Sequence, residues 1–126
     1  MKTAQEMLAV AIGSILGGGL RLALSSWPLL QSTAFPWPTL VANLVGSFLM
    51  GHLAGRLSQS ASGKKALLAP FVLTGFCGGL TTFSIFSLET IVMLEDGRLL
   101  AALSYIALSL TAAIAGAWAG QERRWF

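Results

Sequence analysis

Hydrophobic residues dominate four stretches of this chain, and short runs of charged, proline and glycine residues separate them. The four stretches run from Ala4 to Leu24, from Thr39 to Leu57, from Ala66 to Leu94 and from Leu99 to Gly120. Each reaches the ~20 residues that an α-helix needs to cross the ~30 Å hydrocarbon core of a bilayer. The pattern therefore predicts an all-α membrane protein with four transmembrane helices.

The third stretch, from Ala66 to Leu94, is too long for one straight crossing. As a continuous helix it would measure about 43 Å at about 1.5 Å per residue, which exceeds the hydrocarbon thickness. Gly75, Gly78 and Gly79 lie in its middle and lower the stability of a helix there. We expect a break near the midplane. The main-chain groups that a break frees are tolerated in a bilayer only where they face protein, an ion or water, so the break is a candidate functional site.

Hydroxyl and aromatic side chains follow these glycines, in the sequence TTFSIFSLE from Thr81 to Glu89. Phe83 and Phe86 are three residues apart and share a helix face. Two phenylalanines at this spacing commonly serve packing alone, whereas the hydroxyl groups beside them suit a narrow polar path. A carboxylate is costly in a membrane helix, so we expect Glu89 to accept hydrogen bonds at a helix interface or to be protonated.

Polar residues in the other stretches are further candidates. Burying the Asn43 amide without a partner costs ~1–3 kcal/mol, so we expect a partner, supplied by a neighbouring helix or by a ligand. Tyr105 and Ser109 are four residues apart and share a helix face, although a membrane serine often bonds only its own backbone. Arg21 lies near the end of the first stretch, where it can reach the interface or pair with another group.

Composition supports a single transmembrane domain, residues 1–126. Hydrophobic residues make up 55% of the chain and charged residues 10%, and the mean hydropathy is +0.74. A water-soluble core does not account for these values. The linkers are too short for a separate catalytic domain, and the sequence has no nucleophile–base pair, metal-ligand cluster or phosphate loop that would indicate an enzyme.

The basic residues are unevenly divided between the two ends of the predicted helices. One end carries Lys2, Arg56, Lys64, Lys65, Arg123 and Arg124, and the other carries Arg21 and Arg98. Six against two predicts that both termini lie in the cytoplasm. The net charge of +3 is low for a nucleic-acid-binding protein.

Three motifs in this chain resemble the Fluc, or CrcB, family of fluoride channels. They are GGGLR at 17–21, PTLVANLVGSFLMG at 38–51 and GFCGGLTTFSIFSLE at 75–89, in the order and spacing found in the family. The resemblance covers nearly the whole chain. It implies a fluoride-selective channel that passively exports toxic fluoride from the cytoplasm and resides in the lipid of the plasma membrane, which in bacteria is the inner membrane.

The resemblance also implies a set of site residues. The positions that match the fluoride pore are Asn43, Thr82, Phe83, Ser84, Phe86, Glu89, Tyr105 and Ser109, and Arg21 matches a vestibule cation. The family forms antiparallel, dual-topology homodimers in which the broken helices cross. Main-chain carbonyls that match Gly78 and Thr81 there hold a structural Na⁺. This chain has Ile85 where the family commonly has Thr, which removes one hydroxyl beside the phenylalanines.

Two other interpretations stay open. A small four-helix multidrug exporter, which exchanges protons for drugs, requires a carboxylate in the middle of its first helix. Here Glu6 lies at the start of the first stretch, and the carboxylate in mid-membrane is Glu89. The second alternative, a non-transporting assembly subunit of a membrane complex, would also explain glycine-rich helix faces.

The charge distribution is in tension with a chain that inserts in both orientations. Either the bias is too weak to set the orientation, or this polypeptide pairs with an oppositely oriented homologue. We favour the homodimer.

Overall fold

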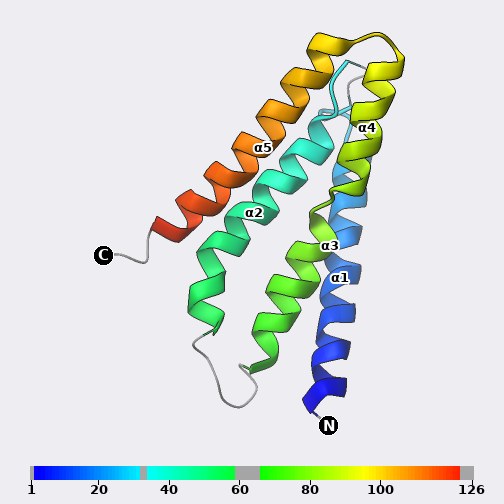
Figure 1. The fold of residues 1–126 in the computed structure, drawn as a ribbon. Coiled ribbons are helices and arrows are strands. Elements are labelled where there is room, and N and C mark those ends of the chain that lie inside the picture. The colour runs from blue at the N-terminus through cyan, green and yellow to red at the C-terminus, as the bar shows by residue number, and fades with distance from the viewer. Residues whose placement is uncertain (1, 32–33, 59–65, 123–126) are drawn as a thin grey trace.

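The computed structural model describes residues 2–31, 34–58 and 66–122, which form helices joined by short connections (Figure 1). The elements are α1 (Lys2–Ser26), α2 (Trp37–Ser58), the π-helix η2 (Pro70–Cys77), α3 (Gly78–Leu80), α4 (Ser84–Glu95) and α5 (Leu99–Glu122). Four segments of the described chain are long and apolar enough to cross a membrane: Thr3–Ser26, Trp37–Leu57, Pro70–Glu95 and Leu99–Gln121. The predicted all-α chain with four spans is confirmed.

The helices pack in two pairs, α1 with η2 and α3, and α2 with α5 (Figure 1). Glycines make both contacts close. A Cβ atom added at Gly17 of α1 would overlap the carbonyl oxygen of Phe76, and one added at Gly51 of α2 would overlap that of Ala117. Backbones can approach this closely only where side chains are absent, which is how helices in lipid gain van der Waals contact.

The third span changes conformation along its length. Residues 66–69 are already helical, the backbone then takes the wider π-helical form from Pro70 to Cys77, and helix continues through α3 to Leu80. Thr81 then takes an extended conformation (φ −80°, ψ 154°), and helical structure resumes at Ser84. Figure 1 shows this connection about halfway along the molecule.

A buried cluster attaches α4 to α5. Phe86 and Met93 of α4 pack there against Ala102 and Tyr105 of α5, and Phe35 lies against the cluster. The cluster holds α4 to the α2–α5 pair, whereas α3 belongs to the α1 pair. The third span therefore passes from one helix pair to the other at its interruption.

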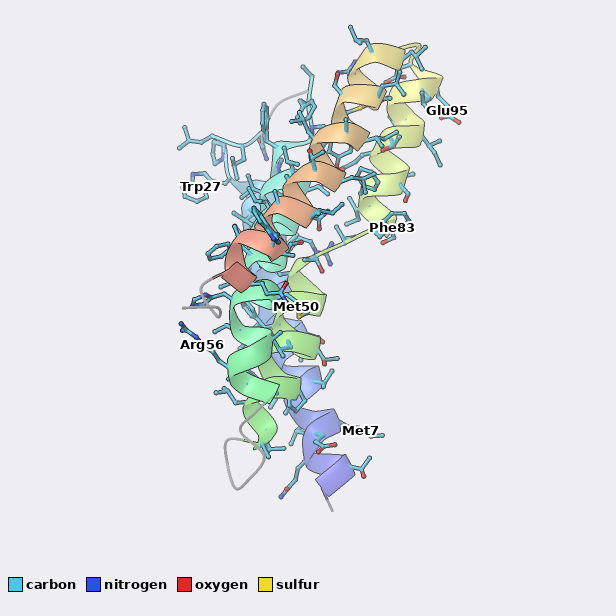
Figure 2. All side chains as sticks on the ribbon, turned by 60° about the vertical axis from the view of Figure 1, so that its left-hand side comes forward. Met7, Trp27, Met50, Arg56, Phe83 and Glu95 are labelled. Carbon is cyan, nitrogen blue, oxygen red and sulfur yellow. The ribbon has the colours of Figure 1, made fainter. Side chains whose placement is uncertain are left out.

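Apolar side chains cover most of the remaining surface. Ile15, Leu100 and Ile114 are each at least 70% exposed in the single chain, as expected for helices that face lipid. Figure 2 places Met7 near one end of the molecule and Glu95 near the other, with Phe83 between them.

Residues 27–31 and 34–36, which lie between α1 and α2, and the turn at 96–98 are at the end of the molecule away from the N-terminus (Figure 1). Gly97 closes the turn with a φ of +72°, which glycine adopts without strain. A guanidinium N–H of Arg98 donates to the carbonyl of Ala34 and ties the two connections together. Most of the basic residues used to predict orientation (Lys64, Lys65, Arg123, Arg124 and the side chain of Lys2) lie outside the described part of the chain, so the orientation stays a prediction.

Candidate functional site at the interrupted helix

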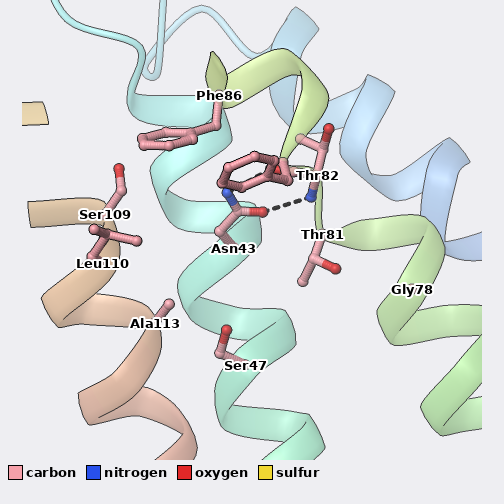
Figure 3. A pocket seen from close by; sticks show the side chains of 10 residues that line it. Asn43, Ser47, Gly78, Thr81, Thr82, Phe86, Ser109, Leu110 and Ala113 are labelled. Carbon is pink, nitrogen blue, oxygen red and sulfur yellow. Dashed lines mark hydrogen bonds between the residues drawn. The ribbon is translucent and has the colours of Figure 1, made fainter. Parts of the chain in front are cut away.

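An open pocket of about 440 Å³ lies beside the interruption (Figure 3). Its walls come from α2, from the chain around the interruption and from α5. The lining residues are Asn43, Ser47, Gly78, Thr81, Thr82, Phe83, Phe86, Ser109, Leu110 and Ala113. The structure thus brings together seven of the residues that the sequence named, from the second, third and fourth hydrophobic stretches.

Asn43 binds the main chain of the interruption with both ends of its amide. Its Nδ2 donates to the carbonyl oxygen of Thr82 at 3.0 Å, and its Oδ1 accepts from the Thr82 N–H at 2.7 Å. Figure 3 shows the amide of α2 reaching across to this peptide. The expected partner of Asn43 is therefore the third span.

Thr82 also binds the first turn of α4. Its Oγ1 accepts a hydrogen bond from the N–H of Ile85 at 3.2 Å and lies 3.3 Å from Oγ of Ser84. A hydroxyl just before a helix satisfies one of the amide groups that the first turn leaves without a partner. Ser84 is thus next to the pocket but does not line it.

The two phenylalanines differ in how firmly they are held. Their ring centroids lie 5.6 Å apart at 44°. Phe86 is 7% exposed and packs on Tyr105, with centroids 5.1 Å apart, whereas Phe83 is 74% exposed in the single chain. Tyr105 is fully buried and supports the Phe86 ring from behind, outside the pocket.

Ser109 differs from the other hydroxyl residues of the region in its hydrogen bonding. The side chain is only 6% exposed, and its Oγ has no hydrogen-bond partner within the described residues. By contrast, Ser87, Thr90 and Thr111 donate to carbonyls of their own helices. An unmet buried hydroxyl costs about 1–3 kcal/mol, and this one belongs to a residue that lines the pocket.

Glu89 lies one turn beyond Phe86, outside this pocket. Its two carboxylate oxygens accept hydrogen bonds from Oγ1 of Thr39 at 2.8 Å and from the hydroxyl of Tyr105 at 2.6 Å. The carboxylate joins α2, α4 and α5, in line with the expectation that it accepts hydrogen bonds at a helix interface. It also borders two further open pockets, of about 500 and 290 Å³. Ile85 lines the larger of these with Glu89 and does not line the pocket of Asn43.

Arg21 also lies outside the pocket and contacts the third span from α1. Its Nε donates to the carbonyl oxygen of Gly79 at 3.2 Å. This carbonyl belongs to α3, where the chain leaves the helical conformation, and a cation is favourable at such a C-terminal end.

Two polar residues of this region were not predicted as site residues from the sequence. Thr39, which binds Glu89, is the first residue of the predicted second stretch, and Ser47 lies one turn beyond Asn43 on the pocket wall. Their hydroxyls and their spacing from Asn43 (four residues on either side) are the signal that could have identified them, because i and i+4 share a helix face.

A cation at the interruption would have to be bound by main-chain oxygens. The described residues contain no group of three or more His, Cys, Asp or Glu side chains that could hold a metal ion. Hard cations bind carbonyl oxygens, and Gly78 itself is exposed, with no atom within 4 Å of an added Cβ. A Na⁺ held by the carbonyls of Gly78 and Thr81 stays a prediction.

The four apolar spans and the polar pocket at an interrupted helix define a multi-pass membrane protein of the kind that moves small solutes. The model of the CrcB-like family, described as Camphor Resistance (CrcB), matches residues 8–121, and the chain belongs to this family.

Curated relatives are similar over most of the chain. The Fluoride-specific ion channel FluC of Bordetella petrii is 49% identical over 111 residues, which are 87% of this chain and 84% of the relative. The proteins of the same name from Rhizobium meliloti and Rhizobium etli are 40% and 42% identical, each over 91% of this chain and 92% of the relative.

Proposed function

We propose that the protein is a fluoride-selective ion channel that lets fluoride leave the cytoplasm down its gradient. The observation that carries the proposal is its similarity, over most of its length, to proteins named as fluoride-specific ion channels. As a channel it catalyses no reaction. Its four spans make it a multi-pass membrane protein, with the inner membrane as its location in a bacterium.

The pocket has the chemistry that fluoride requires. Fluoride is small and strongly hydrated, so a pore must replace its water with hydrogen-bond donors. The second N–H of the Asn43 amide and the free hydroxyl of Ser109 are such donors. The ring edges of Phe83 and Phe86 carry partial positive charge, and the N-terminal end of α4 adds the positive end of a helix dipole.

Weak contacts suit an ion that must also leave. None of the ten residues that line the pocket has a charged side chain, so no single group holds an anion tightly. We place Glu89 and Tyr105 beside the path beyond Phe86. Thr82 on the pocket wall and Ser84 next to it supply further hydroxyls. Arg21 acts on the other side of the interruption as a cation that raises the local concentration of anions.

A second copy of the chain in antiparallel orientation completes the pore. In the single chain the pocket is open and Phe83 is largely exposed, and polar groups facing hydrocarbon would be costly. An inverted copy that crosses at the interruption, near the middle of the bilayer, would cover both. The family resemblance supports this arrangement, and a homodimer fits the single sequence more simply than a pair of homologues.

The same crossing would bring the carbonyls of Gly78 and Thr81 from both copies together around a structural Na⁺. The charge of the ion would offset the repulsion between carbonyl dipoles that point at one another. In this proposal the ion stabilises the dimer and takes no part in fluoride passage.

Purified protein in liposomes tests the proposal against its alternatives. With a fluoride electrode outside, vesicles loaded with potassium fluoride should release it when a potassium ionophore balances the charge, and vesicles loaded with chloride should not. Proton uptake coupled to a cationic drug would indicate the exporter instead. A protein that shows neither fluoride release nor drug-coupled proton uptake would indicate an assembly subunit.

A further inference from the structure

The hydrogen bonds of Thr82 suggest a second role for Asn43. In a continuous α-helix each N–H donates to the carbonyl four residues before it. The N–H of Thr82 would then donate to Gly78, and its carbonyl would accept from Phe86. Among the main-chain hydrogen bonds of the described residues neither pair is present, and Asn43 occupies both places.

We infer that Asn43 is a positioning residue that keeps the third span interrupted by satisfying both main-chain groups of Thr82. A buried peptide that leaves a helix loses two hydrogen bonds, which disfavours the break unless other groups replace them. The amide is suited to this task because it has an acceptor and a donor on adjacent atoms. A serine or threonine at this position could not reach both groups.

The pair of hydrogen bonds between Asn43 and the Thr82 main chain, here called the Asn43 clamp, has a consequence for the Gly78 carbonyl. Because the Thr82 N–H is bound to Asn43, this oxygen does not receive the hydrogen bond that an unbroken helix would give it. The pairing between α2 and the third span therefore leaves one of the proposed Na⁺ ligands free. This step rests on the proposed function, but the clamp itself does not.

The clamp also sets the position of the pocket wall. Thr82 immediately precedes Phe83, and its hydroxyl accepts a hydrogen bond from the first turn of α4. Fixing the Thr82 peptide therefore fixes both the start of α4 and the main-chain position from which the Phe83 side chain extends. Thr81 is held separately, since its N–H and its Oγ1 both bond to the Cys77 carbonyl at 2.9 Å. Asn43 thus supplies hydrogen bonds from another helix to the extended part, while Gly46 of the same helix packs against Thr81.

Amide hydrogen exchange, measured residue by residue by NMR on the full-length protein in micelles, tests the inference. In Asn43→Ser the Thr82 amide should exchange about tenfold faster or more, because its hydrogen bond is lost. Amides of α5 should keep their rates. Asn43→Asp retains the acceptor oxygen, so its Thr82 amide should stay as protected as in the wild type. Ser47→Ala, one turn along the same pocket wall, is the matched control and should leave the Thr82 rate unchanged.

An unchanged Thr82 rate in Asn43→Ser would overturn the inference, as would equal rates in the Ser and Asp variants. If Asn43 were only an anion ligand, fluoride efflux would fall in Asn43→Ser while Thr82 exchange stayed constant. The two proposals fail separately. If the wild-type protein carries no fluoride, the proposed channel is refuted and the exchange result still holds. If the wild type conducts fluoride but Thr82 amide exchange in Asn43→Ser equals that of the wild type, only the positioning role of Asn43 is refuted.

Discussion

At the residue scale, the site depends on a division of polar groups between structure and pore. Ser87, Thr90 and Thr111 satisfy themselves on their own helices. Glu89 uses both oxygens to join neighbouring helices, and Ser109 keeps a free hydroxyl. Hydroxyl groups that look alike in the sequence therefore differ in what they can offer an anion.

The phenylalanine pair gives the first prediction. Phe83→Ile and Phe86→Ile should each lower fluoride efflux about tenfold or more, because losing an aromatic edge worth ~1.4 kcal/mol to the ion in transit costs a factor of ten in rate. Phe86→Ile should in addition lower stability by about 1–2 kcal/mol, since that ring is buried on Tyr105. The measurements are liposome efflux and thermal unfolding in detergent.

Phe48→Ile is the control for this pair, because Phe48 is partly exposed on α2 and does not line the pocket. It should leave efflux unchanged. Wild-type efflux in both pore variants would remove the rings from the mechanism.

Glu89 gives the second prediction. In Glu89→Gln one of the two carboxylate oxygens becomes an NH₂ group, which cannot accept from Thr39 or Tyr105. The loss of that charge-assisted bond should lower stability by about 1–3 kcal/mol, seen as a lower thermal unfolding midpoint. The same change at exposed Glu95, the last residue of α4, should have no effect. Equal midpoints for the two variants would contradict a joining role for Glu89.

At the scale of elements, hydrophobic pattern predicted three of the four spans to within two residues at each end, as α1, α2 and α5. Length and glycine content marked the third span as unusual, but neither predicts the π-helix from Pro70 to Cys77. The hydrogen-bond partners of individual side chains could not be predicted from the sequence. The pairing of Asn43 with Thr82, or of Arg21 with Gly79, depends on how helices distant in sequence are packed, and periodicity within one helix carries no such information.

Helix pairing gives the third prediction. Gly51→Ala should lower stability by about 1–3 kcal/mol, because the new methyl group would overlap the Ala117 carbonyl and push α2 away from α5. Gly19→Ala is the matched control, since nothing lies within 4 Å of a Cβ added there. It should leave stability unchanged or raise it by up to about 1 kcal/mol. Thermal unfolding that ranks the two variants in the opposite order would contradict the close α2–α5 contact.

At the scale of the whole molecule, the single chain leaves its polar pocket open. Its third span runs from the α1 pair to the α2–α5 pair and exposes Gly78 and Phe83 at the interruption. Within lipid such a surface calls for a partner, which in our proposal is an inverted copy of the chain. The exposure observed at Gly78 makes this proposal testable by a single substitution.

Gly78→Val is the fourth prediction. Within one chain an added Cβ at this position meets nothing within 4 Å, so the monomer fold should persist. Across the proposed crossing the larger side chain would collide with the second copy, and the dimer should dissociate. Light scattering coupled to size-exclusion chromatography measures the assembly, and circular dichroism checks the helix content. A dimeric, conducting Gly78→Val protein would contradict a crossing at the interruption.

The most direct test of the central claim is the reversal potential of the current through the purified protein in a planar bilayer, with fluoride on one side and chloride on the other. A fluoride-selective pore predicts a potential that follows the fluoride gradient and stays unchanged when the chloride concentration is varied. A potential that follows chloride, or a bilayer that carries no current with the protein incorporated, would contradict the account.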